Sequence, residues 1–199
     1  MQPHEEVLEF RRKTFHLVCG TVIAALLWLG VVDGYFLAAV SFFLLGFFLL
    51  VREDQVRWPL FHAFLHLFER EQHLKIAPGK SAIYFLFGSA AVALLFPLDI
   101  AVASILILAF GDAVSCLVGH HFGTVTTPLH PKKAVEGPIV AIIISSVVAS
   151  LFVPFWMAAI AASVAMVLEM PRWTVLGWHV DDNLIIPISS TIVFSLLGA

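Results

Sequence analysis

The sequence predicts an all-α fold: a polytopic transmembrane bundle of about seven spanning helices with one interfacial amphipathic helix. Of its 199 residues 60% are hydrophobic and 13% charged, whereas a soluble domain carries about 25% charged residues. The mean hydropathy is +0.98, and the apolar residues gather in long segments. One integral-membrane domain covering residues 1–199 accounts for this length. The formal net charge of −3 argues against a nucleic-acid-binding protein.

Seven apolar segments approach the length of a spanning helix, which needs about 20 residues. They cover residues 15–32, 35–51, 80–96, 99–118, 137–153, 155–170 and 183–198. Three very short turns, at Asp33, Pro97 and Pro154, predict antiparallel neighbours. Because the first apolar run follows a polar start and is long enough to span, we do not expect a cleavable signal peptide.

The stretch 52–79 has a different character. Its large apolar residues recur every three or four positions, with histidines and charged residues between them: Trp58, Phe61, Phe64, Leu65 and Phe68. This spacing predicts an amphipathic helix that lies in the membrane interface.

The basic residues indicate the orientation. All eleven Lys and Arg residues lie in or beside 1–14, 52–79, 119–136 and 171–182. Because basic loops stay in the cytoplasm, we expect a multi-pass integral membrane protein with a cytoplasmic N-terminus. The opposite turns carry only Asp33 and Asp99. Such a bare outer face argues against a transporter, and the short loops fit a prokaryotic inner membrane.

Asp112 stands out because it lies within an otherwise apolar segment. A charge there costs several kcal/mol unless it is paired or hydrated, so it is a functional candidate. Small residues recur every four positions around it, at Gly111, Ser115, Gly119 and Gly123. Close helix packing explains such a stripe, but it does not explain the carboxylate.

Two further polar groups precede apolar segments. Lys132, Lys133 and Glu136 lie at the start of one helix, where free N–H groups favour phosphate; snorkelling lysines and a helix cap are the alternative. Asp181, Asp182 and Asn183 precede the last helix. One N-cap needs only one such residue, and Mg²⁺ prefers oxygen ligands that it shares with phosphates.

Two further places in the sequence, residues 12–16 and Lys80, hold less distinctive candidates. Arg12 and Lys13 belong to a basic cluster that satisfies the topology by itself, but His16, one turn later, is not needed for it. A core role and a site role are therefore both open for His16. Lys80 follows Gly79 in a stretch that resembles the end of a P-loop, but the first glycine of that motif is replaced by Leu74. We reject the P-loop and keep Lys80 as a candidate phosphate contact.

Taken together and in order, these motifs resemble the polyprenol kinase family, which includes dolichol kinase, phytol kinase and the CTP-dependent diacylglycerol kinase. The resemblance covers nearly the whole chain and is carried by Arg12-Lys13-x-x-His16, Gly111-Asp112-Ala113 with Gly119 and Gly123, Lys133-x-x-Glu136-Gly137, and Asp182-Asn183-Leu184-x-x-Pro187. The chain is also similar to the membrane-bound cytidylyltransferases that form CDP-activated lipids. Members often have Ser or Thr after the loop lysine, where this chain has Ala134.

The resemblance implies phosphoryl transfer from CTP to the hydroxyl of a membrane lipid alcohol, with Mg²⁺ as cofactor. Its partners would be the nucleotide triphosphate and a polyprenol, a phytol-type isoprenoid or a diacylglycerol, and an oligomer is possible. Asp112, Lys133 and Glu136 would be catalytic. Metal ligands would come from Asp112, Glu136, Asp181 and Asp182. Cofactor contacts would come from Arg12, Lys13, His16, Lys80, Gly119, Gly123, Lys132 and Asn183.

Two alternatives stay open at this point. A cytidylyltransferase would instead form a CDP-lipid and release pyrophosphate. A small ion-coupled transporter would use Asp112 as its coupling residue.

Overall fold

The computed structural model describes residues 3–52, 79–127, 130–171, 173–175 and 178–198. This part contains seven helices: α1 (Pro3–Trp28), α2 (Gly34–Arg52), α5 (Lys80–Leu95), α6 (Leu98–Phe122), α7 (Glu136–Ala149), α8 (Phe155–Glu169) and α9 (Asp182–Leu197). Two short antiparallel hairpins lie between helices. One, between α6 and α7, pairs β1 (Thr126–Thr127) with β2 (His130–Ala134), and the other, between α8 and α9, pairs β3 (Thr174–Val175) with β4 (Trp178–His179).

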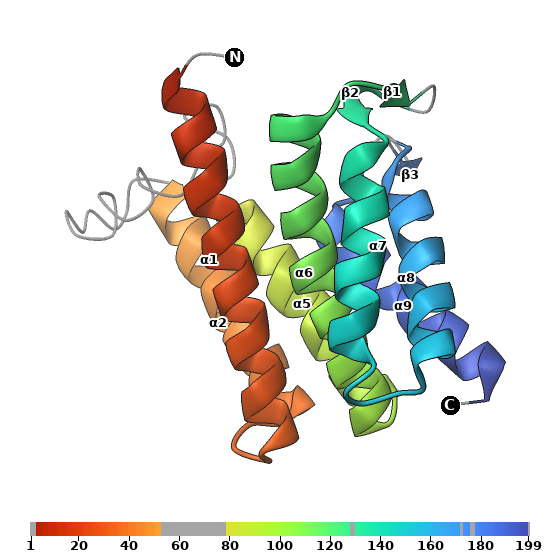
Figure 1. Ribbon diagram of the computed structural model, residues 1–199. Coiled ribbons are helices and arrows are strands. Elements are labelled where there is room, and N and C mark those ends of the chain that lie inside the picture. Colours follow the sequence, from red (N-terminus) through yellow and green to blue (C-terminus); the bar gives the residue numbers. More distant parts are fainter. Residues whose placement is uncertain (1–2, 53–78, 128–129, 172, 176–177, 199) are drawn as a thin grey trace.

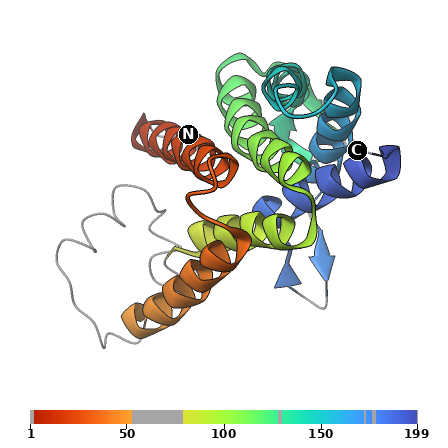
Figure 2. The ribbon, with the colours of Figure 1, turned by 90° about the horizontal axis from the view of Figure 1, so that it is seen from below.

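The helices run alternately up and down (Figure 1). The start of α1 and the two hairpins lie at one end of the bundle, and the C-terminus and the tight turns lie at the other. Seen along the bundle, α6 to α9 form one compact group, while α2 and α5 extend to its side and α1 lies next to α6 (Figure 2). The polar connections are therefore gathered at a single end.

Helix α6 forms the centre of the molecule, since it packs against α1, α5, α7, α8 and α9. Its residues from Ile100 to Ala109 are all buried. In the described part α6 is the one helix that is long and apolar enough to span a membrane, and five other helices contain apolar stretches of 10–17 residues. Large apolar side chains point outward elsewhere, as at Tyr35, Phe43 and Leu151. A helix bundle in lipid is expected to have such a surface.

The predicted all-α fold is confirmed in outline, and the seven described helices match the seven apolar segments. The predicted amphipathic helix within 52–79 lies outside the described residues, apart from its first residue and its last. Helix α1 begins twelve residues before its predicted apolar span, because the good helix formers among residues 3–14 continue the helix beyond the apolar stretch. The hairpins were not predicted, because their strands are too short to show an alternating pattern.

Glycines bring α6 and α7 into close contact. A Cβ at Gly137 would clash with the backbone carbonyl of Ser115 and would lie 3.1 Å from the Cα of Gly119. A Cβ at Gly123 would clash with Ala134 on β2 and with the carbonyl of Gly119. The small-residue stripe of α6 therefore serves close packing, as expected for such stripes.

Substituting Gly137 by Ala tests this contact. We expect Gly137→Ala to lower the free energy of unfolding by about 1–3 kcal/mol, because the added methyl group overpacks a backbone contact. The measurement is thermal unfolding in detergent, followed by tryptophan fluorescence. Gly119→Ala is the matched control, since its Cβ would meet Gly137 at an ordinary 3.6 Å. Equal stability of the two variants would contradict this account of the crossing.

Candidate functional site

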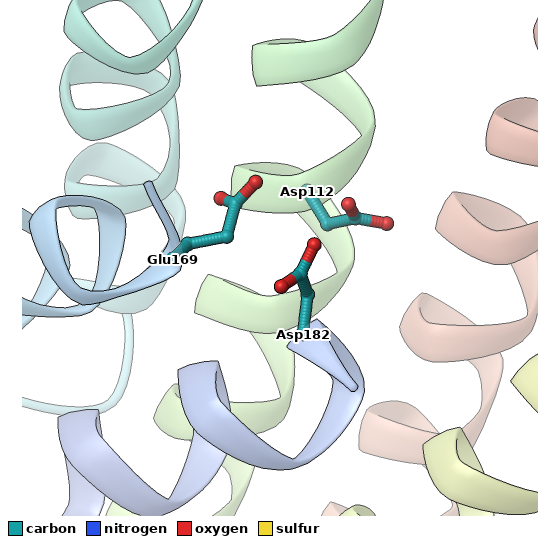
Figure 3. A group of neighbouring side chains, drawn as sticks. All are labelled: Asp112, Glu169 and Asp182. Carbon is teal, nitrogen blue, oxygen red and sulfur yellow. The ribbon is translucent and has the colours of Figure 1, made fainter. Parts of the chain in front are cut away.

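Three carboxylates from three helices meet inside the bundle: Asp112, Glu169 and Asp182 (Figure 3). One oxygen of each lies within 4.8 Å of the others. Asp112 and Glu169 are 7% and 5% exposed, while the side chain of Asp182 is 37% exposed. We call these three residues the carboxylate cluster.

Helix ends deliver two of these carboxylates. Glu169 is the last residue of α8 and Asp182 the first residue of α9. Asp181 caps α9, because its Oδ1 accepts hydrogen bonds from the backbone N–H of Asn183 at 3.2 Å and from its side-chain Nδ2 at 2.7 Å. This use of Asp181 agrees with the preference for Asp at N-caps, and it turns Asp182 toward α6.

Lys13 pairs with Asp112 across 99 residues of sequence. Its Nζ donates to both carboxylate oxygens at 2.6 Å. Gly20 and Ala109 allow this approach, because a Cβ on Gly20 would clash with the side chain of Ala109 and α1 can therefore lie close to α6. His16, one turn after Lys13, places its Nε2 3.6 Å from Asp112 Oδ2.

Lys133 binds the other side of the carboxylate cluster from β2. Its Nζ donates to Glu169 Oε1 at 2.6 Å and to the Glu169 backbone carbonyl at 3.1 Å, and it lies 3.6 Å from Asp182 Oδ2. A cation at this helix end is favoured by the helix dipole. Lys133 therefore ties the hairpin to the ends of two helices.

The electrostatics of Asp182 and Lys133 reflect this crowding. Burial raises the pKa of Asp182, and the neighbouring Asp112 and Asp181 raise it further against the effect of Lys133. Burial acts to lower the pKa of Lys133, but Glu169 and Asp182 outweigh it and leave that pKa raised. When all groups are ionised, the three carboxylates exceed the two lysines by one negative charge.

The donor set fits a hard divalent cation such as Mg²⁺, which takes carboxylate and amide oxygens. Two buried side-chain oxygens support this fit. Glu169 Oε2 and Asn183 Oδ1 are buried and have no hydrogen-bond partner in the described part of the chain. Buried oxygens are rarely left unpaired, so both are available as ligands.

Glu136 lies at the first position of α7 and not in the carboxylate cluster. Its Oε1 accepts hydrogen bonds from the Thr124 hydroxyl at 2.5 Å, the Thr124 backbone N–H at 2.8 Å and the Val125 N–H at 3.0 Å. These bonds hold the start of the hairpin against α7. Its Oε2 is buried without a partner among the described residues, so the proposed catalytic and metal-ligand roles of Glu136 stay predictions.

The other predicted contacts are spread around this centre. Arg12 pairs with Glu9 at 3.4 Å. Lys80 begins α5 and lies over the Tyr84 ring, 5.4 Å from its centroid. Next to it, the Ser81 carbonyl accepts from Asn183 Nδ2 at 3.3 Å, which links α5 to α9. The side chain of Lys132 is outside the described residues.

Gly119 and Gly123 have the packing role described above, and their contact with a cofactor stays a prediction. The same holds for Arg12, Lys80 and Lys132, whereas Lys13, Lys133 and Asn183 lie at or beside the carboxylate cluster.

Sequence reasoning missed Glu169. It stands at the end of an apolar segment, between Leu168 and Met170, and there it resembles an ordinary charge at a membrane boundary. The argument used for Asp112, that a carboxylate in apolar surroundings needs a reason, could have identified it. Its neighbours in the fold could not be deduced from its position in the chain.

Glu136 makes a pH-dependent contribution to stability. The Thr124 hydroxyl, followed by backbone N–H groups, lowers the pKa of Glu136 to about 2 from the ordinary 4.5. This contribution is present above the unfolded pKa and is lost as the pH falls from about 4.5 to about 2. We expect the unfolding temperature of Glu136→Gln to fall less between pH 5 and pH 3 than that of the wild type. Thr124→Val should reproduce part of this effect; identical pH profiles in all three proteins would count against it.

Comparison with known proteins gives one relative at low identity. The CTP-dependent diacylglycerol kinase 1 of Schizosaccharomyces pombe (strain 972 / ATCC 24843) is 27% identical over 135 residues. The match covers 59% of this chain and 60% of that protein, so the chain spans less than two thirds of the relative's length. No family model and no solved structure matches the chain.

This match agrees with the family resemblance that the four sequence motifs carry. The fold brings most of the residues of these motifs to one end of the bundle. The match therefore supports a relationship between this chain and the polyprenol and diacylglycerol kinases.

Proposed function

We propose that this protein is a membrane-embedded kinase that transfers the γ-phosphoryl group of CTP to the hydroxyl of a lipid alcohol. One observation carries the proposal: three buried or partly buried carboxylates and two lysines converge within an apolar helix bundle. Phosphoryl transfer needs chiefly positioning and neutralisation of charge, and the carboxylate cluster and its lysines supply both.

The nucleotide half of the reaction belongs to the carboxylate cluster. Mg²⁺ held by Asp112, Glu169 and Asp182 would neutralise charge on the β- and γ-phosphates. Lys13 and Lys133 flank these carboxylates, so their ammonium groups are within reach of phosphate oxygens that join the same site. Glu136 fixes the hairpin that carries Lys133, and it therefore positions that lysine.

The acceptor half involves Asp112 and the apolar surface. The alcohol oxygen forms a bond to the γ-phosphorus while the bond from that phosphorus to the β–γ bridging oxygen breaks and CDP leaves. The hydroxyl proton passes to the Asp112 carboxylate. Since the outer surface of the bundle is apolar, the hydrocarbon part of the substrate can stay in lipid while its head reaches the site. The N-terminus and the site would face the cytoplasm.

The relative supports this assignment through its name, which specifies CTP as the donor and diacylglycerol as the acceptor. Diacylglycerol is accordingly the first acceptor to test, ahead of polyprenols and phytol-type isoprenoids.

The reaction is tested with purified protein in detergent, Mg²⁺ and γ-labelled CTP or ATP. We expect label in diacylglycerol or another lipid alcohol, more with CTP than with ATP, and none after chelation of the metal. CDP and phosphorylated lipid are the expected products. Pyrophosphate with a CDP-lipid would identify a cytidylyltransferase, and no product from any lipid in folded protein would contradict the kinase.

Two variants connect this activity to the site. Asp112→Asn and Asp182→Asn should each lower kcat at least about a hundredfold, because each removes a charge that positions the reacting phosphate. Asp99→Asn is the matched control on the same helix, because its carboxylate lies at the far end of α6, where it accepts a hydrogen bond from the Ile100 N–H. Full activity of both site variants, with normal folding, would rule out the mechanism.

Glu169 can be tested without turnover. Mn²⁺ replaces Mg²⁺ and its binding is followed by electron paramagnetic resonance in the presence of CTP. We expect Glu169→Gln to weaken Mn²⁺ binding by about tenfold or more, whereas Asp33→Asn, which alters a turn at the opposite end, should leave it unchanged. Unaltered Mn²⁺ affinity in Glu169→Gln would remove Glu169 from the metal site.

A further inference from the structure

His16 has an unused hydrogen-bonding atom at the centre of the site. Its side chain is 13% exposed, and Nε2 is buried without a hydrogen-bond partner among the described residues. A buried ring nitrogen without a partner is costly. The position of His16 on α1 therefore requires an explanation beyond packing.

The distance between His16 and Asp112 suggests which kind of group would bind His16 Nε2. Nε2 and Asp112 Oδ2 are 3.6 Å apart, which is beyond a hydrogen bond. A single oxygen could lie about 2.8 Å from both atoms, within ordinary hydrogen-bond range. An oxygen can bridge polar atoms that are more than 3.5 Å apart, and a hydroxyl suits both because it donates and accepts.

The surroundings favour the hydroxyl of an apolar molecule. The His16 ring packs edge-on against Phe85 of α5, with ring centroids 4.5 Å apart. On α1, the neighbouring Phe15 and Val18 are 40% and 53% exposed. A hydrocarbon chain that lies along this apolar surface would bring its polar end to the gap between His16 and Asp112.

We propose that His16 Nε2 and Asp112 Oδ2 together bind the acceptor hydroxyl of the lipid alcohol. The hydroxyl donates to Asp112 and accepts from the Nε2–H of His16. This inference rests on the proposed kinase function and assigns the acceptor position within it. Lys13, Glu169 and Asp182 serve the nucleotide, His16 serves the lipid, and Asp112 lies between the two substrates.

This division makes His16 a specificity residue for one substrate only. Removing its ring should weaken binding of the lipid and leave the nucleotide and the metal bound as before. Hydrolysis of CTP by water, in the absence of lipid, should also persist, because water does not need the lipid to be oriented.

The experiment compares His16→Ala, His16→Gln and His121→Ala with the wild type. His121 lies at the exposed end of α6, where its ring Nδ1 is 3.0 Å from the Leu117 carbonyl, so its variant is the matched control. For each protein we would measure KM for the lipid alcohol, KM for CTP, CTP hydrolysis without lipid, and Mn²⁺ binding. Thermal unfolding by tryptophan fluorescence reports whether each variant folds.

We expect KM for the lipid to rise about tenfold or more in His16→Ala, as for the loss of one buried hydrogen bond. His16→Gln, which keeps an N–H donor, should recover part of this loss. In His16→Ala, the KM for CTP, CTP hydrolysis without lipid and Mn²⁺ binding should be unchanged. His121→Ala should match the wild type in all four measurements. An unchanged lipid KM in His16→Ala would mean that only water bridges the gap and would overturn the inference. A parallel loss of CTP and Mn²⁺ binding would also overturn it, since His16 would then serve the nucleotide.

Direct binding separates this inference from the kinase proposal. A photoreactive lipid alcohol and the same lipid with hydrogen in place of the hydroxyl are compared for labelling of each protein. The wild type should prefer the alcohol, and His16→Ala should lose most of that preference. Both of these labelling results are expected whether or not phosphate is transferred. A wild type that binds both lipids equally would overturn the inference, whereas alcohol preference without transfer would contradict only the kinase.

Discussion

The structure depends on compensating charge inside an apolar bundle. Asp112 lies on α6, the helix that packs against most of the others, and Lys13 from α1 binds both of its oxygens. A buried carboxylate without this partner would destabilise the fold by several kcal/mol. The same pair holds α1 against α6, so the first helix and the central helix are joined by the group that the reaction would use. Stability and the proposed reaction would therefore depend on the same atoms, and we expect Lys13 and Asp112 to change only together.

The second constraint is the gathering of helix ends. Glu169 ends α8 and Asp182 begins α9, while Lys133 reaches both from the hairpin before α7. Helix ends supply unpaired backbone groups as well as charges, and Lys133 binds one of these carbonyls directly. Small residues at Gly119, Gly137 and Gly20 shorten the distances between helices, so that short side chains can meet. The packing of the bundle thus determines the size of the site.

The sequence was sufficient for the helices and for two of the three clustered carboxylates. Asp112 and Asp182 could be predicted because carboxylates beside apolar segments have few ordinary explanations. Glu169 was missed, because the same residue type at the end of a helix resembles an ordinary boundary charge until α8 is placed beside α6. The pairing of Lys13 with Asp112 spans 99 residues, and no local pattern carries that information. Glu136 was a candidate from the sequence, because it is a carboxylate at the start of a helix. Its hydrogen bonds to Thr124 and Val125 are visible only in the fold.

The placement of both hairpins and the start of α1 at one end of the bundle has a consequence for the proposed product. The opposite end consists of tight turns, so under the proposed function a lipid that gained a phosphate at this site would remain in the leaflet that faces the nucleotide. A phosphorylated head group crosses an apolar layer only at a high energetic cost. Any process that consumes the product on the other side of the membrane would need a separate lipid-translocating protein. The enzyme would in this way determine the side as well as the chemistry of the lipid that it makes.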